Sequence, residues 1–259
     1  MILSIAIPTF NRAELLDQSL RTLVPQCENR PVEICVSNNA SGDETAQVLA
    51  RYPSVRAVHQ PVNIGIDRNT VAALEMGAGR YLLPIGDDEL ISPVGIGLIV
   101  SALRRKPHML MLNGWHADRS HLPSELEGRS FTNPSAAFAA LWDKMPLGSF
   151  VIRREAIACG HAARYLDTFH AYSGAAWDYL ASLPSFRIDC MAHPVIDFRE
   201  VPKSWRQESD RIHGDCIPRW FDLMPYAFGT AVERSRLRYL TGWGASRQYS
   251  PLAGLESYS

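Results

Sequence analysis

The fold of this chain is decided by residues 81–89, which read Tyr-Leu-Leu-Pro-Ile-Gly-Asp-Asp-Glu. The run Tyr81–Ile85 predicts a short buried strand, and Gly86–Glu89 predict an acidic turn at its carboxyl end. Three consecutive carboxylates repel one another, and capping of a following helix uses at most one of them. A divalent cation bound by hard oxygen ligands would relieve the repulsion, which favours Mg²⁺ or Mn²⁺. The alternative is a solvated acidic loop.

The residues before this turn alternate between strand and helix patterns. Strands are predicted at Leu3–Ile7, Val32–Val36, Val55–His59 and Tyr81–Ile85. Helical spacing between them predicts helices that begin near Ala13, Ser41 and Asp67. The predicted end signals are the capping boxes Asn11/Glu14 and Ser41/Glu44, a cap by Asp67, and Pro25 as the stop of the first helix. This βαβαβαβ order predicts an α/β fold, a Rossmann-like and mostly parallel sheet with helices on both faces.

The residues after the turn carry weaker patterns. They predict a helix over Ser92–Lys106, strands over Met109–Asn113, Phe150–Ile152 and Phe186–Cys190, a helix opened by Asn133-Pro134, and a polar loop over 201–218. We find no linker or internal repeat. We therefore expect one domain over 1–259, with a first half (1–100), a second half (101–220) and a helical tail (221–259).

The composition narrows the class of protein. The 259 residues are 46% hydrophobic and 20% charged, with 26 Lys and Arg against 27 Asp and Glu, so a dedicated nucleic-acid binder is not expected. No apolar run reaches the roughly 18 residues that span a bilayer, and the N-terminus does not resemble a secretion signal. The five cysteines are spread without a CxxC pair, which predicts reduced thiols and a cytoplasmic location.

The turn after the first strand excludes several enzyme classes. Pro8–Arg12 contains no glycine, whereas a Rossmann dinucleotide site needs a glycine-rich turn there. The chain has no GxxxxGK[ST] loop for a nucleotide hydrolase and no G-x-S-x-G elbow for an esterase. Ligands of open parallel sheets bind at the carboxyl ends of the strands, so we expect the site after Ile7, Val36, His59 and Ile85.

Four segments in order resemble the family 2 glycosyltransferases. They are residues 4–12 (Ser-Ile-Ala-Ile-Pro-Thr-Phe-Asn-Arg), residues 36–45, the run from Asn63-Ile64-Gly65 through Asn69 to Tyr81, and Gly86-Asp87-Asp88-Glu89, which stands where the family has its Asp-x-Asp signature. The resemblance covers about the first hundred residues, and it implies that 1–100 form a nucleotide-sugar-binding half and 101–220 an acceptor-binding half. It implies the glycosyltransferase A fold, a nucleotide-sugar donor with UDP or dTDP, and Mn²⁺ or Mg²⁺ as the cation.

The resemblance also implies roles for single residues. Those expected at the donor nucleotide are Pro8, Thr9, Asn11, Arg12, Asn38, Asn39, Asn63, Gly65, Arg68 and Asp87. Asn39 is expected at the base edge and Asp87 at the ribose. Asn38 stands where an aspartate is common, so its contact with the base lacks charge assistance. The metal ligands implied are Asp88, Glu89 and His213.

An inverting transfer needs a base that deprotonates the acceptor hydroxyl. The family places an Asp or Glu at the start of a late helix, and Ala175 stands at the matching position here. We nominate Asp178, one helical turn further on, with Asp167 and His170 as substitutes. The alternative for each is a structural role in or before the helix.

The tail from Gly229 to Tyr249 holds four arginines, one acid and interleaved aromatic residues. This pattern suits peripheral contact with an anionic membrane, and equally a helix that packs on its own domain or on a second subunit in a homodimer. By the family's habits the acceptor is a glycan or lipid-linked oligosaccharide in cell-surface polysaccharide or lipopolysaccharide biosynthesis. The alternatives are a non-catalytic nucleotide-sugar-binding module and a nucleotidyltransferase.

Overall fold

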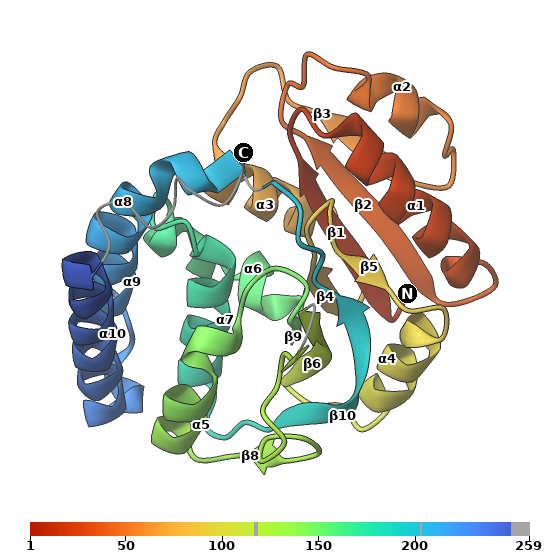
Figure 1. The fold of residues 1–259 in the computed structure, drawn as a ribbon. Helices are drawn as coiled ribbons and strands as arrows, with labels where there is room; N and C mark the ends of the chain where they lie inside the picture. Colours follow the sequence, from red (N-terminus) through yellow and green to blue (C-terminus); the bar gives the residue numbers. More distant parts are fainter. Residues whose placement is uncertain (117–118, 203, 250–259) are drawn as a thin grey trace.

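The computed structural model describes residues 1–116, 119–202 and 204–249, and within them one mixed sheet is flanked by helices (Figure 1). The strands are β1 (Leu3–Thr9), β2 (Val32–Asn38), β3 (Arg56–His59), β4 (Tyr81–Pro84), β5 (Leu90–Ile91), β6 (Met109–His116), β7 (Arg119–Ser120), β8 (Ser130–Phe131), β9 (Phe150–Arg153) and β10 (Ile188–Asp197). Their order is β3-β2-β1-β4-β9-β6-β10-β5, with β7 on β6 and β8 on β10.

The helices follow the predicted alternation in the first half of the chain. They are α1 (Ala13–Cys27), α2 (Thr45–Ala50), α3 (Ile66–Glu75), α4 (Gly95–Leu103), α5 (Pro134–Leu141), α6 (Glu155–Ala158), α7 (Ala171–Ser182), α8 (Ser209–Arg211), α9 (Ile217–Asp222) and α10 (Thr230–Tyr249). None of the described helices is both long and apolar enough to cross a membrane.

The sheet brings the predicted site segments to one edge. β1 pairs parallel with β2 and β4, and β2 pairs parallel with β3, so all four strands end on the same side. β9 runs antiparallel between β4 and β6, which makes the sheet mixed. Alternate residues of β1 face opposite layers: Ile5 and Ile7 pack against the α1 and α4 layer, and Ala6 packs on the side of α3, α5 and α7.

The predicted helix ends in the first half are partly wrong. Neither predicted capping box forms, because one carboxylate, that of Asp43, accepts hydrogen bonds from Ala13 N (2.9 Å) and Thr45 N (3.0 Å) at the starts of α1 and α2. α1 also continues through Pro25 to Cys27. A proline in the last turn removes one N–H and leaves earlier turns intact, which explains its tolerance there.

The polar loop predicted for 201–218 is also wrong. This region contains η3 (Ser204–Glu208), α8, the π-helical η4 (Ile212–Cys216) and the start of α9. Ile212, Cys216 and Trp220 are buried at 3% exposure each, so tertiary packing stabilises helical turns that local propensity does not indicate. The cysteines are free thiols, as predicted.

Candidate functional site

Four predicted site residues meet at the carboxyl ends of β1 and β4. Thr9 Oγ1 donates to Asp87 Oδ2 at 2.8 Å, and Arg12 donates from Nη1 to Asp87 Oδ1 and from Nη2 to Asp88 Oδ2, each at 2.8 Å. Asp87 and Asp88 are each 3% exposed. Burial lowers the pKa of Arg12, but the charges of Asp87 and Asp88 outweigh it and raise this pKa above its ordinary value. The protonated guanidinium therefore offsets the two carboxylates.

The backbone of the acidic turn is held from α1. Ser19 Oγ lies 2.8 Å from the carbonyl oxygen of Asp87 and 3.1 Å from that of Glu89. A Cβ at Gly86 would lie 2.1 Å from Glu89 Oε2, so no larger residue fits there without moving that side chain. Ser19 thus holds the backbone of the turn, and the absence of a side chain at Gly86 leaves room for the Glu89 carboxylate.

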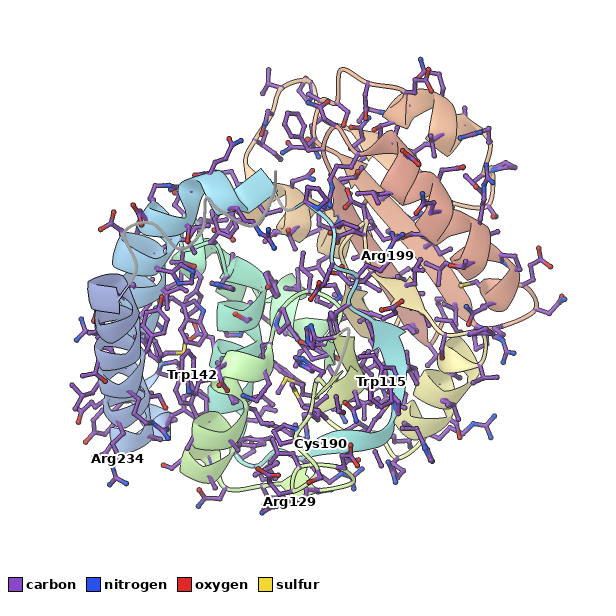
Figure 2. All side chains as sticks on the ribbon, in the orientation of Figure 1. Trp115, Arg129, Trp142, Cys190, Arg199 and Arg234 are labelled. Carbon is purple, nitrogen blue, oxygen red and sulfur yellow. The ribbon has the colours of Figure 1, made fainter. Side chains whose placement is uncertain are left out.

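A segment that sequence reasoning missed crosses the acidic turn. After β10, Arg199 donates from Nε to the carbonyl oxygen of Asp88 and from Nη1 to Gln18 Oε1 at 2.6 Å (Figure 2). The carbonyl oxygen of Pro202 accepts from Arg12 Nη2 at 3.3 Å. Among the described residues, Arg199 Nη2 is buried without a hydrogen-bond partner. Its position just after a strand was the only signal in the sequence, because 111 residues separate it from Asp88.

The asparagines predicted at the nucleobase are hydrogen-bonded within the protein. Asn39 Nδ2 donates to Asn63 Oδ1 at 2.9 Å, and Asn39 Oδ1 accepts from Ile64 N at 2.8 Å. Asn38 Oδ1 accepts from Ser41 N at 3.0 Å. These bonds connect the loops after β2 and β3, so the amides fix the walls of the region where β1, β2 and β3 end.

The remaining predicted nucleotide residues lie along the same edge. Asn11 has a positive φ of 53° and accepts at Oδ1 from Gly42 N at 2.7 Å. Pro8 lies within β1, opposite Ser37 of β2. Gly65 precedes α3 with φ 82°, a conformation that favours glycine.

Two acidic residues, Asp67 and Asp167, connect α3 to the segment before α7. Asp67 does not cap its own helix: its Oδ1 accepts from Ala171 N (3.0 Å) and its Oδ2 from Phe169 N (2.9 Å), which caps α7. Arg68 pairs with Asp167 at 2.6 Å, and both side chains are about half exposed (47% and 56%). These contacts join α3 to the segment that leads into α7.

The structure places Asp178 in a buried network inside the helical layer. Tyr165 Oη donates to Asp178 Oδ1 at 2.6 Å, and Arg164 Nη1 lies 3.3 Å from both carboxylate oxygens. Tyr165 Oη also lies 3.0 Å from the carbonyl oxygen of Leu223. Asp178 is seven residues past the start of α7 at Ala171, about 10 Å along the axis. Its contacts connect η2 (His161–Tyr165) to α7 and not to the acidic turn.

His170 stands at the N-terminus of α7. Burial, together with the nearby His213, lowers the pKa of His170 to about 4, so the imidazole is neutral at pH 7. Its ring centroid lies 6.1 Å from that of Tyr172. Burial and the charges of Asp67 and Glu89 raise the pKa of Tyr172 above its ordinary value.

The predicted metal set is not assembled. Within the described ranges, no three His, Cys, Asp or Glu side chains are grouped to hold a metal ion. Among the described residues, His213 Nδ1 lies 2.7 Å from Tyr239 Oη of α10. Asp88 and Glu89 remain two hard-oxygen donors, a set that fits Mg²⁺ or Mn²⁺ when substrate phosphates supply further ligands.

Comparison with known proteins identifies the family to which the chain is similar. The model of the family described as "Glycosyl transferase family 2" matches residues 4–140. Abequosyltransferase RfbV of Salmonella typhimurium is 31% identical over 110 residues, 40% of this chain and 33% of RfbV. The uncharacterized protein Rv1520 of Mycobacterium tuberculosis is 32% identical over 111 residues, 40% of this chain and 32% of Rv1520. The match thus spans about a third of the length of these curated relatives.

Solved structures resemble the whole fold. TarS 1–349 of S. aureus in complex with UDP-GlcNAc has a TM-score of 0.72 at 13% identity, over 99% of this chain and 77% of that chain. The mannosyltransferase PcManGT of Pyrobaculum calidifontis, in complex with GDP-Man and Mn²⁺, has a TM-score of 0.59 at 14% identity, over 94% of this chain and 75% of that one. At these identities the likeness concerns the fold alone, and it confirms the predicted glycosyltransferase A fold.

Proposed function

The chain belongs to glycosyl transferase family 2, and we propose that it transfers a sugar from a nucleoside diphosphate sugar to a hydroxyl group of a glycan, with inversion and with a divalent cation. The observation that supports this most directly is the buried arrangement of Thr9, Arg12, Asp87 and Asp88 where β1 and β4 end. Two of the neighbours in fold were solved with a nucleotide sugar, UDP-GlcNAc or GDP-Man.

The donor nucleoside is proposed to lie across the ends of β1 and β2. Thr9 Oγ1 directs one oxygen of Asp87, and Arg12 holds the other, so the carboxylate is oriented before any ribose hydroxyl reaches it. Because the Asn39 amide is bonded at both ends within the protein, we assign recognition of a UDP or dTDP base mainly to backbone groups of the loops after β1 and β2. Arg68 is assigned to the rim of the proposed donor nucleotide site.

The leaving diphosphate is proposed to lie over the acidic turn. Asp88 and Glu89 would hold Mn²⁺ or Mg²⁺, which when bound neutralises charge that develops on the departing phosphates. We propose that Arg199 supplies a second positive group to the leaving diphosphate. Its buried Nη2, which has no hydrogen-bond partner among the described residues, would point toward the phosphates. Donation of that N–H to a phosphate oxygen would satisfy a buried donor that otherwise costs stability.

We assign His170 as the general base that takes the proton from the acceptor hydroxyl. The neutral imidazole has a lone pair available at pH 7, and the negative charge of a bound diphosphate would raise the low pKa of His170 toward the working pH. The acceptor oxygen then bonds to the sugar carbon as its proton moves to His170, while the bond from that carbon to the phosphate oxygen breaks and the nucleoside diphosphate leaves. Asp178 is not proposed as the base, because Tyr165 and Arg164 already occupy its carboxylate.

The acceptor is proposed to be a glycan of the cell surface, on a lipid or free, acted on in the cytoplasm. The support is the 31% identity over 110 residues to an abequosyltransferase of Salmonella typhimurium. The sugar transferred stays to be identified by experiment.

The test is release of nucleoside diphosphate from a panel of UDP-, dTDP- and GDP-sugars with Mn²⁺ or Mg²⁺. Removal of the metal with EDTA and the substitution Asp88→Asn should each lower the rate by about a hundredfold or more, a size typical for loss of one transition-state charge partner. His170→Asn should lower transfer to a sugar acceptor, and Asp178→Asn should not. Turnover that is unaffected by Asp88→Asn would refute the proposed site.

A further inference from the structure

A row of cations lies along the sheet edge opposite the candidate site. We call it the basic edge, and it consists of Arg80, Arg104, Arg105, Lys106, Arg153, Arg154 and Arg187. In Figure 1 the end of α4 and the start of β10 lie at this lower edge, while the segment that follows β10 lies above. The whole chain has 26 Lys and Arg against 27 Asp and Glu, so this concentration of one sign is local.

Backbone contacts bring these cations together. Arg154 N donates to the carbonyl oxygen of Arg80 at 3.0 Å, and Arg153 Nη2 donates to that of Lys106 at 3.0 Å. Arg187 Nη2 donates to the carbonyl oxygen of Arg105. Guanidinium groups that bond to carbonyl oxygens keep their full charge, so these contacts do not neutralise the edge.

The carboxylates at this edge compensate little of the charge. Asp189 is 5% exposed and lies 3.2 Å from Arg187 Nε and 3.7 Å from Arg105 Nε, and the exposed Glu155 follows Arg154 in the chain. Burial together with the charges of Arg153 and Arg187 lowers the pKa of His108. This direction agrees with a positive potential at the edge.

Helix α4 adds an exposed apolar stripe beside the basic edge. Residues 92–106 contain no Asp or Glu. Val94, the residue before α4, is 66% exposed; Leu98 within α4 is 36% exposed, and the exposed Ser101 lies one turn after Leu98, shortly before the exposed Arg105 past the helix end. The exposed apolar residues are therefore followed directly by cations of the basic edge.

We propose that this stripe and the basic edge form a docking surface for an anionic lipid bilayer. The cations lie in a row from the start of β4 to the start of β10, which suits a broad negative surface. An interfacial membrane site combines such cations with apolar side chains that enter the headgroup region. A soluble polyanion would use the cations and leave Val94 and Leu98 in water, so the apolar stripe favours the bilayer.

This surface differs from the C-terminal tail, for which the sequence pattern predicted contact with a membrane. On α10, Arg236 pairs with Asp222 at 3.1 Å, and the side chains of Trp243 and Tyr249 lie outside the described residues. Arg234 and Arg238 lie one turn apart on α10 and offer a matched pair of cations for comparison.

Docking at the basic edge also sets a condition on the acceptor, which rests on the proposed function. β1 spans seven residues, roughly 23 Å at about 3.3 Å per residue, and the candidate site lies beyond its far end. A lipid-linked acceptor must extend across that height, so its reacting sugar belongs to a glycan chain and is not the sugar attached to the lipid.

The experiment is flotation of the full chain with vesicles of phosphatidylcholine, with and without phosphatidylglycerol. We expect binding to the anionic vesicles only. Each cation at an anionic surface contributes about fivefold to the partition coefficient, so Arg104→Glu/Arg105→Glu/Lys106→Glu should lower it by about a hundredfold or more. Val94→Ser/Leu98→Ser should lower it severalfold, and a thermal melt of each variant checks folding.

The matched control is Arg234→Glu/Arg238→Glu, which should float like the unchanged chain. Loss of flotation in this control with retention in the α4 triple variant overturns the proposal in favour of the tail. Equal flotation of all variants, or no flotation of the unchanged chain, overturns it as well. Asp88→Asn should float normally, so failure of the proposed catalytic site and failure of the docking surface give different results.

Discussion

Replacement of Arg12 by Gln tests whether this guanidinium is the internal counter-ion of the acidic turn. Both of its hydrogen bonds to Asp87 and Asp88 are 2.8 Å long, and the side chains are 19% exposed for Arg12 and 4% for each carboxylate. Removal of one partner from a buried ion pair costs about 3–5 kcal/mol, because the other charge stays buried without compensation. Since Arg12 is partly accessible to water, we reduce this to about 2–4 kcal/mol.

The measurement is thermal unfolding of the full chain in EDTA at pH 7. For a protein of this size, 1 kcal/mol corresponds to roughly 2–4 °C, so Arg12→Gln should lower the Tm by roughly 5–15 °C. Addition of Mn²⁺ without nucleotide should raise the Tm of Arg12→Gln more than that of the unchanged chain, because a bound cation then replaces the missing charge.

The control is Arg68→Gln, which removes a cation whose partner Asp167 is exposed. An exposed pair contributes about 0–1 kcal/mol, so the Tm of this variant should stay within a few degrees of the unchanged chain. If Arg12→Gln has the same Tm as Arg68→Gln, and Mn²⁺ does not raise the Tm of Arg12→Gln, the reasoning about charge compensation at the turn is refuted.

Three further predictions concern other parts of the fold. Burial lowers the pKa of His121 to about 4 from about 6.5 in the unfolded chain, so the unfolded state binds more protons between these values and stability falls as pH drops through that window. Between pH 7 and pH 4, the free energy of unfolding of His121→Gln should decrease by about 2–3 kcal/mol less than that of the unchanged chain. Asp178→Asn should lower stability by about 1–3 kcal/mol, because the bonds from Tyr165 and Arg164 lose their charged acceptor, while donor turnover per folded molecule is retained. Gly86→Ala should lower Mn²⁺-dependent donor turnover, because the added Cβ would lie 2.1 Å from Glu89 Oε2 and the proposed metal ligand Glu89 must turn aside; unchanged turnover would contradict a role of the Glu89 carboxylate.

The first half of the fold could be predicted because its signals are local. Alternating apolar residues in β1 and β2, helical spacing in α1 and α3, and short polar turns after each strand specify a parallel sheet whose strand ends share one edge. The position of Asp87 and Asp88 follows from this order alone. Caps and boundaries were less predictable, as α1 shows by running through Pro25.

The sequence by itself determined the family, the sheet of β1 to β4 and the edge that carries the acidic turn. Only the tertiary structure decided which side chains act together there. Arg199 reaches Asp88 across 111 residues, and Asp67 caps α7 at Ala171 across 104. Periodicity reports the face on which a residue lies, whereas these contacts depend on how distant segments pack, and no local pattern encodes that packing.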